Sequence, residues 1–192
     1  MASIGLRYPV YAPLTENESS VTFNYGSGKV AAKAIRVDVK LNVSDEPLYA
    51  DDGVSERLRE FIDGSMTFTP DDLSPEVRAD WLGNDISEVT LGSETVEVLS
   101  SNIEDTPGYF GFGFYVPKVV NNVRKYRAII YTKVQFGEPD ENMETKGQKV
   151  TWQTPAVVGN IMRRVDGDWK KEVTVSSIAT AVAWLKSELN IT

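Results

Sequence analysis

The chain has 192 residues, which is enough for one domain with a single hydrophobic core. It contains neither cysteine nor histidine, so disulfides, thiolate metal sites, cysteine nucleophiles and Ser-His hydrolase triads are excluded. Its 20 basic and 28 acidic residues give a formal net charge of −8, which opposes binding to the phosphates of DNA.

The first 29 residues show no sustained hydrophobic period. They mix Pro9, Pro13, Gly26 and Gly28 with a few aromatic side chains, and this composition predicts an irregular N-terminal arm. The chain does not open on a basic and apolar leader, and no apolar run approaches the ~20 residues of a membrane-spanning helix. We therefore expect a chain that is made and used without secretion and has no membrane partner.

Strict alternation of apolar and polar residues predicts a half-buried strand over residues 35–43. Its apolar face carries Ile35, Val37, Val39, Leu41 and Val43. The following stretch, residues 44–56, is acidic and is expected to be a loop. A second strand is predicted over residues 57–69, where Gly64 permits a kink.

A short helix is predicted to follow Ser74, because this serine is a good N-cap, Pro75 suits the first helical position and Gly83 suits the end. Further strands are predicted over residues 94–99, 109–116 and 125–136. In the second of these, phenylalanines alternate with glycines, which allow close approach of another group. The third is the longest and has apolar residues on both faces, so we expect it to be central.

Residues 137–149 are polar and predict a long hairpin connection. Residues 150–165 and 169–175 are expected to pair with each other across a turn at Asp166, Gly167 and Asp168. The end of the chain predicts an amphipathic helix, capped by Ser176 or Ser177. Its apolar stripe is formed by Ile178, Val182, Leu185 and Leu189, with Ala181 and Trp184 beside them.

This order of elements predicts an α+β, mostly β fold, with an antiparallel sandwich or barrel, a short inserted helix and a C-terminal helix. We expect one domain over residues 1–192, because no linker or internal repeat divides the chain. Its parts are the arm (1–29), the β core (30–175) with the acidic loop (44–56), and the C-terminal helical segment (176–192).

Six motifs carry a resemblance to a known family. They are DEPLYADD (45–52), GYFGFG (108–113), YRAIIYTKV (126–134), ETKG (144–147), WQTP (152–155) and AWL (183–185). In this order, over about residues 30–186, the chain resembles the phi13-type major tail proteins of siphophages. The resemblance implies a tail-tube fold, with two packed antiparallel sheets flanked by a helix, and hexameric rings that stack head to tail.

The resemblance also implies partners and a location. The subunit would contact copies of itself, the tape measure, tail terminator and tail tip proteins, and viral DNA that passes through the tube without specific binding. It would lie in the virion tail after assembly in the host bacterial cytoplasm. A ring of six copies would carry a formal charge of −48 (six times −8), which would repel phosphates over about one Debye length, ~8 Å.

No catalytic, cofactor or metal residues are expected in such a protein, whose functional residues are contact surfaces. We expect subunit contacts in the acidic loop and in the polar connection that follows residue 137. The candidate interface residues are Leu48, Tyr49, Asp51, Asp52, Glu138, Asp140, Glu141 and Lys146. Leu48 and Tyr49 are the expected anchors, and the alternative is that they cap the core of their own subunit.

Other interpretations of single motifs are weaker. The acidic pairs at 51–52, 71–72 and 140–141 lack the spacing of a calcium loop, so solvated surface is favoured over metal binding or glycosidase chemistry. The aromatic run at 109–114 lacks the basic groove of a single-stranded nucleic acid site, which favours core packing. The basic pairs at 124–125 and 163–164 are expected at the surface or in salt bridges between subunits.

Two rival functions come from other classes. The chain could be a β-sandwich binding module, such as a virion decoration or receptor-binding domain, which stays monomeric or forms small closed oligomers. It could also be a small enzyme that works with carboxylates, although the absence of histidine disfavours this and we expect no enzymatic activity.

Overall fold

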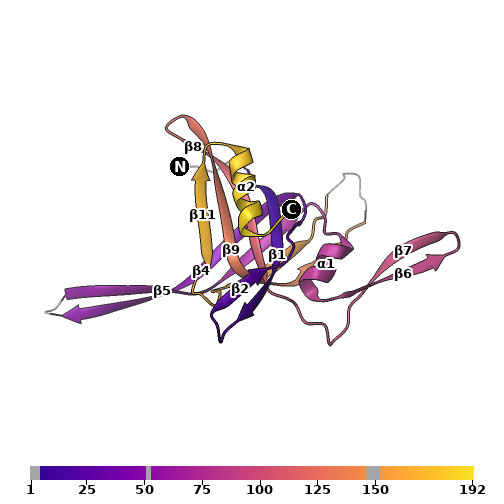
Figure 1. Ribbon diagram of the computed structural model, residues 1–192, viewed down its shortest axis with the longest axis horizontal. Coiled ribbons are helices and arrows are strands. Elements are labelled where there is room, and N and C mark those ends of the chain that lie inside the picture. Colours follow the sequence, from indigo (N-terminus) through magenta and orange to yellow (C-terminus); the bar gives the residue numbers. More distant parts are fainter. Residues whose placement is uncertain (1–4, 51–52, 146–151) are drawn as a thin grey trace.

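The computed structural model describes residues 5–50, 53–145 and 152–192, which are mostly β, with antiparallel sheets and two helices. The elements in chain order are β1 (Arg7–Asn17), β2 (Thr22–Tyr25), β3 (Lys29–Val30), β4 (Ala34–Ala50), β5 (Gly53–Pro70), α1 (Pro75–Leu82), β6 (Asp85–Leu91), β7 (Glu94–Ser100), β8 (Phe110–Val120), β9 (Val123–Asp140), β10 (Ala156–Met162), β11 (Lys170–Val175) and α2 (Ile178–Glu188) (Figure 1). This agrees with the predicted α+β, mostly β class. Neither helix is long and apolar enough to cross a membrane, within the part of the chain described.

Nine strands form one antiparallel sheet with β9 at its centre. The strand order is β2-β1-β8-β9-β10-β5-β4, while β11 also pairs with β9 and β3 with β1. The predicted central position of residues 125–136 is therefore confirmed, and the side chains from Ala128 to Thr132 are buried. The hairpin of β6 and β7 forms a separate two-stranded sheet.

The main sheet curls around its own core. Strands β5 and β8 are separated by two strands in the sheet order, which would place them ~14 Å apart in a flat sheet. The ring centroids of Phe68 on β5 and Phe112 on β8 nevertheless lie 5.3 Å apart. The two halves of the sheet therefore face each other across a shared aromatic core, as in a sandwich.

Helix α1 closes this first core. Ser74 caps its N-terminus by accepting a hydrogen bond from the Val77 amide, and Gly83 ends it in the left-handed conformation (φ 77°), so the predicted boundaries are confirmed. Trp81 of α1 is 1% exposed. Its ring stacks on Phe136 with centroids 3.9 Å apart, and this contact fixes the helix against β9.

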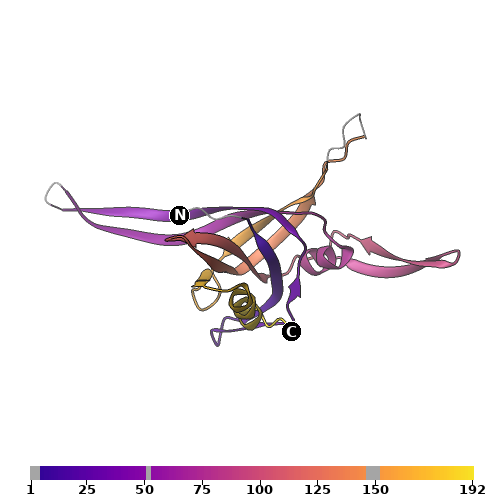
Figure 2. The ribbon, with the colours of Figure 1, turned by 90° about the horizontal axis from the view of Figure 1, so that it is seen from above.

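Helix α2 covers the opposite face of β1, β8 and β9 (Figure 2). Its cap is Ser177, and Ala181, Leu185 and Leu189 are fully buried, so the predicted helix is confirmed. Its predicted apolar stripe is confirmed only in part, because Ile178 is 41% exposed. The glycines of β8 receive the buried side chains. A Cβ atom on Gly111 would lie 2.6 Å from Leu189, which explains why the bare face of the phenylalanine-glycine run is required.

The prediction of an irregular N-terminal arm is wrong. Residues 7–17 form β1, which lies between β2 and β8 in the sheet. Val10, Tyr11 and Ala12 are all buried, so apolar and small residues follow one another without the alternation that reveals a half-buried strand. A register shift between Arg7 and Val10 accommodates Pro9, as is usual for proline in a sheet.

The prediction of an acidic loop over residues 44–56 is also wrong. β4 and β5 continue beyond the core as one long hairpin, whose backbone pairs Ser44 with Glu60 and, further out, Ala50 with Gly53. The charge of Asp45 is compensated within this ladder, because Arg59 lies opposite it on β5 and Arg57 also forms an ion pair with it. The pairing register also shifts next to Gly64, between Asn42 and Val43, where the hairpin leaves the core.

The predicted pairing between the last two strands is wrong as well. β10 pairs with residues 133–140 of β9 and β11 with residues 126–131, so the two strands follow each other along the same edge of β9. The turn at Asp166 and Gly167 exists, with the Gly167 amide donating to the Arg164 carbonyl oxygen. It redirects the chain along β9 instead of reversing it into a hairpin.

Candidate assembly surfaces

A two-stranded arm projects from the body of the molecule. We define it as residues 44–60 of β4 and β5, which Figures 1 and 2 show extending away from the sheet. The core ends just before it, where Phe61 stacks on Trp169 with ring centroids 4.3 Å apart. A two-stranded ribbon with no covered face is marginally stable in water, so this arm is suited to contact another molecule.

Cross-strand pairs hold the arm together on one face and leave an apolar group on the other. Asp45 lies 2.6 Å from Arg57 and 3.2 Å from Arg59, so part of its charge is neutralised within the arm. Leu58, opposite Glu46, is 59% exposed. At the base of the arm, Ile62 is exposed as well.

The candidate interface residues fall in two separate groups. The backbone of Leu48 pairs with Glu56 and that of Tyr49 with Val54, so both residues lie on the outer part of the arm. Their side chains are outside the described part of the structure, as are Asp51, Asp52 and Lys146. Whether Leu48 and Tyr49 are interface anchors stays a prediction.

The second group lies beside α1. Glu138 is exposed near the end of β9, and Asp140 is paired with Ala156 of β10. Glu141 forms an ion pair with Arg78 of α1. This group does not meet the arm, because the end of β9 and the arm extend toward different sides of the body (Figure 2).

The outer edge of β4 is a long unpaired edge. No other strand of the described residues pairs with this edge, although β4 contains 17 residues. Typical strands have 3–10 residues, and exposed edges of this length are templates for pairing with another chain. Ile35, Leu41 and Val43, which were expected on the half-buried face of this strand, are exposed. Only Val37 and Val39 of that face pack against the core. A second chain that paired here would satisfy the backbone groups and cover the exposed side chains.

A second projecting hairpin was missed by the sequence analysis. Only residues 94–99 were predicted as a strand, whereas β6 and β7 together form a hairpin whose side chains are nearly all exposed. Val89, Leu91 and Val98 are among them. The alternation over residues 85–91 and the Gly92-Ser93 turn are the signals that could have identified it.

The expectation that Arg163 and Arg164 share the surface is half wrong. Arg163 is exposed, whereas Arg164 is 3% exposed. The Nε of Arg164 donates to Asp166 Oδ1 at 2.9 Å, and its guanidinium carbon lies 3.3 Å from the centroid of Phe23. Burial would lower the pKa of Arg164, but its hydrogen bonds to Asp166 and Tyr25 keep that pKa above its ordinary value.

This buried arginine connects distant parts of the chain. Its Nη1 donates to the Tyr25 hydroxyl at 3.2 Å, and that hydroxyl donates to the Thr132 carbonyl oxygen at 2.7 Å. Burial raises the pKa of Tyr25 to about 12, although Arg164 offsets part of the rise. The cluster therefore joins β2, β9 and the turn before β11 in the interior, and is structural in character.

Charged side chains elsewhere form pairs rather than reactive groups. The pKa of Glu172 is lowered to about 2 by hydrogen bonds from Arg127 and Lys170. Tyr11 donates to Asp80 at 2.5 Å, and its pKa is raised by burial and by this hydrogen bond. Within the described ranges, no three acidic side chains gather in a group that could hold a metal ion.

Comparison with known proteins does not assign the chain to a family. No protein-family model matches it, and no curated protein matches it. The features of the chain that bear on function are its exposed surfaces, namely the arm, the free edge of β4 and the β6–β7 hairpin.

Proposed function

We propose that this chain is the major tail tube subunit of a long-tailed bacteriophage. In this role it assembles into hexameric rings, and the rings stack into the conduit through which DNA is ejected. It acts without catalysis, in the virion tail, after assembly in the bacterial cytoplasm. Its partners are copies of itself, the tape measure, terminator and tail tip proteins, and the DNA that passes through the tube.

The projecting arm and the free edge of β4 carry this proposal. Both expose backbone hydrogen-bonding groups and apolar side chains that the described part of the subunit leaves uncovered. A neighbour that paired along β4 would extend the sheet from one subunit to the next, and repetition around an axis would close a barrel without edges. The curled antiparallel sheet with one helix on its outer face is compatible with a tail-tube fold.

The charge of the chain supports the same role. Its net charge of −8 gives an assembled ring a negative field, so that a polyanion can pass without being bound. A protein that must hold DNA needs the opposite balance. Duplex DNA should therefore show no measurable binding to the assembled protein at physiological salt, as measured by fluorescence anisotropy.

The test compares the parent protein with an arm-shortened variant. In the variant, residues 44–60 are replaced by Asn-Gly, which joins Val43 to Phe61 through a two-residue hairpin turn. Size-exclusion chromatography with light scattering and negative-stain microscopy should show rings or tubes for the parent at high concentration. The variant should remain monomeric, with a melting temperature within a few degrees of the parent.

A parent protein that stays strictly monomeric at high concentration, with and without a tail-tip complex as a nucleus, contradicts the proposal. A small closed oligomer would instead favour the binding-module alternative, because tube contacts between rings do not close.

A further inference from the structure

The β6–β7 hairpin has one apolar face that no other element of the described residues covers. Residues opposite each other in an antiparallel pair share a face, and Val89 lies opposite Val96, Ser87 opposite Val98 and Leu91 opposite Glu94. Leu91, at the tip, is 63% exposed. The tip therefore presents a leucine with a carboxylate directly across from it.

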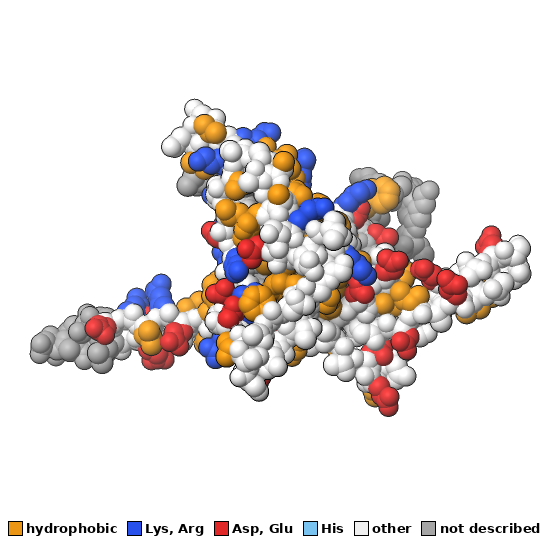
Figure 3. Space-filling model, viewed as in Figure 1, with side chains coloured by type: hydrophobic (Ala, Val, Ile, Leu, Met, Phe, Trp, Pro, Cys, Tyr) orange, Lys and Arg blue, Asp and Glu red, His pale blue; other side chains and the backbone are white. Residues whose placement is uncertain are grey.

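This hairpin is also strongly acidic. Between Arg78 and Lys118 the sequence contains no basic residue and seven acidic ones. Glu88 and Glu97 lie directly opposite each other on the other face of the hairpin, an arrangement that destabilises an isolated ribbon. None of the acidic residues of β6 and β7 forms an ion pair within the described part of the chain. Figure 3 shows acidic side chains over α1 and the β6–β7 end of the molecule.

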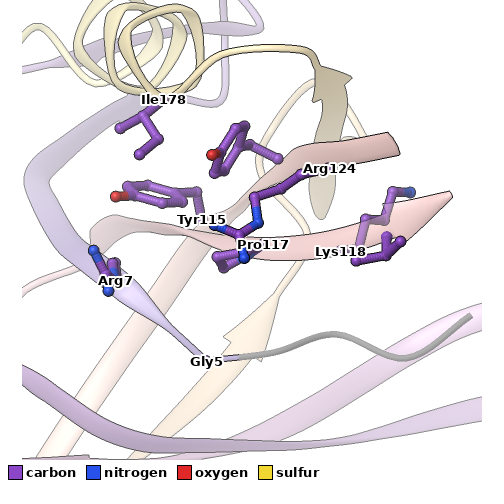
Figure 4. A pocket seen from close by; sticks show the side chains of 9 residues that line it. Gly5, Arg7, Tyr115, Pro117, Lys118, Arg124 and Ile178 are labelled. Atoms are coloured by element: carbon purple, nitrogen blue, oxygen red, sulfur yellow. The ribbon is translucent and has the colours of Figure 1, made fainter. Parts of the chain in front are cut away.

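A pocket of the opposite character lies between β1, β8, β9 and α2. Its cavity of about 250 Å³ is lined mainly by apolar groups, among them Tyr115, Pro117, Val119, Tyr126 and Ile178 (Figure 4). For comparison, a cavity of about 150 Å³ holds a benzene molecule. The pocket can therefore accept a large aliphatic side chain from outside.

The rim of this pocket is basic. Arg7, Lys118 and Arg124 line it, and no acidic residue does. In Figure 4 the side chain of Arg124 extends from β9 toward Pro117 on β8. None of the three basic side chains is ion-paired with an acidic residue of the described ranges. From residue 106 to residue 137 the sequence has five basic residues and no acidic one, so no local carboxylate offsets this charge.

We propose that the β6–β7 hairpin of one subunit docks in this pocket of a second copy of the chain. Leu91 enters the cavity, and Glu94, on the same face, meets the rim formed by Arg7, Lys118 and Arg124. Glu88 and Glu97 add to the attraction without direct contact. The chemistry of the two surfaces identifies the hairpin as the occupant of the pocket, because a leucine beside carboxylates complements an apolar cavity with a basic rim.

The placement of the two surfaces makes the contact intermolecular. The hairpin and the β8–β9 end with its pocket lie on different sides of the body in both ribbon views (Figures 1 and 2). A contact between two different surfaces is heterologous, so each subunit can give its hairpin to one neighbour and receive that of another. Such contacts generate rings or open filaments. The inference thus rests on the proposed self-association and names one of its contacts.

Charge reversal on each side provides the first test. One variant carries Glu94→Lys and Glu97→Lys on the hairpin, and the other carries Lys118→Glu and Arg124→Glu on the rim. Each variant alone faces like charges, and we expect the concentration needed for assembly to rise roughly tenfold or more. An equimolar mixture should recover assembly, because each hairpin then meets a rim of opposite charge.

The matched control carries Glu18→Lys and Glu144→Lys, two exposed residues outside both the acidic hairpin region and the pocket lining, with the same change of net charge as the hairpin variant. It should assemble at the parental concentration. If either charge-reversed variant assembles like the parent, or if the mixture fails to recover, the docking proposal is wrong.

A cross-linking test uses the absence of cysteine from the chain. One chain carries only Ser93→Cys at the hairpin tip and a second carries only Val119→Cys at the rim. Under mild oxidation, the mixed pair should form a covalent heterodimer at least tenfold faster than the Ser93→Cys chain mixed with a Ser20→Cys chain. Ser20 lies in the exposed β1–β2 turn. Equal rates would overturn the proposal.

The two proposals fail in different ways. Specific cross-linking without rings or tubes would keep the docking contact and reject the tail tube. Tubes from a charge-reversed variant, without specific cross-linking, would keep the tail tube and reject the docking contact.

Discussion

The body of the molecule and its two projecting hairpins use the same strand chemistry with opposite results. In the body, β1, β8 and β9 are covered on both faces, by an aromatic core on one and by α2 on the other. In the arm and in the β6–β7 hairpin, paired strands extend into solvent with apolar side chains exposed. Backbone pairing alone therefore does not bury a strand, and the uncovered hairpins are the parts of the chain that we propose contact a partner.

The largest effect on folding should come from the core of the body. Replacing Trp81, which stacks on Phe136, by alanine should lower the free energy of unfolding by about 3–5 kcal/mol. The control is Trp152→Ala, because Trp152 is 88% exposed and its loss should change stability by less than ~0.5 kcal/mol. Urea unfolding of the monomer measures both. Equal losses of unfolding free energy in the two variants would contradict the assignment of Trp81 to the core and of Trp152 to the surface.

The buried arginine should have the next largest effect. Arg164→Ala removes hydrogen bonds to Asp166 and Tyr25 and leaves the Tyr25 hydroxyl with one partner fewer. We expect a loss of about 2–3 kcal/mol, below that of a fully buried pair because Asp166 retains access to water. Arg163→Ala, one residue away and exposed, should leave the urea midpoint almost unchanged. A similar shift of the urea midpoint in both variants would show that the loss of a positive charge, and not the loss of the buried hydrogen bonds, lowers the stability.

An ion pair at the surface of the body should have a smaller, pH-dependent effect. The pKa of Glu172 lies at about 2 in the folded chain, below its ordinary value of 4.5. The carboxylate therefore stabilises the fold above pH ~4.5, and this stabilisation is lost as the pH falls toward 2. Because Glu172 is 44% exposed, the whole contribution should be under ~1 kcal/mol.

Comparison of Glu172→Gln with the parent measures this contribution. The variant should be slightly less stable at pH 7 and should approach the stability of the parent as the pH falls through 2, as followed by denaturant unfolding at each pH. A difference that persists unchanged at low pH would contradict the ion-pair explanation.

The smallest effect on the monomer is expected in the arm, together with the largest effect on assembly. The double change Leu48→Ala and Tyr49→Ala should alter the free energy of unfolding by less than ~0.5 kcal/mol and should abolish tube formation. Thermal melting and negative-stain microscopy measure the two effects. A monomer that melts far below the parent would show that both side chains belong to the core of their own subunit.

The sequence predicted best those elements whose stability is local. Helix α1 has an N-cap, a first-position proline and a terminal glycine, all within ten residues, and its boundaries are as predicted. The apolar stripe of α2 and the phenylalanine-glycine alternation of β8 are equally local signals. For α2 and β8 the spacing of the apolar residues indicates which face is buried, and for α1 the capping residues mark the two ends.

Other elements depend on partners that are far away in the chain. β1 is an interior strand because β8, about one hundred residues later, pairs with it, and nothing within residues 1–29 signals this. The acidic stretch 44–56 belongs to a strand pair, in which Arg59 lies opposite Asp45 and Arg57 forms a second ion pair with it. Arg164, in the turn before β11, is buried in a cluster with groups of β2 and β9. Long-range pairing and burial of charge are what single-sequence patterns do not reveal.

The assembly surfaces were predicted only in outline. We expected the residues around Leu48 to form contacts between molecules. They lie in a projecting arm, which is compatible with this expectation, and the contact itself is still to be tested. The β6–β7 hairpin and the basic pocket were not expected. The acidic residues of the hairpin and the basic residues of the pocket rim come from different stretches of the sequence. The sequence does not show, however, that the fold places the two surfaces on different sides of the body.

The pairing of β1 with β8 has a consequence for the order of folding during synthesis. The β4–β5 hairpin is formed by neighbouring residues and can form as soon as residue 70 has left the ribosome. β1 must wait for residues 110–115, and the Arg164 cluster must wait for most of the chain. Sheets built from such distant pairings fold in milliseconds to seconds. Because an uncovered two-stranded ribbon is only marginally stable, the newly made chain can form its arm only transiently before the body. Premature pairing of arms between nascent chains is therefore a hazard until the body closes.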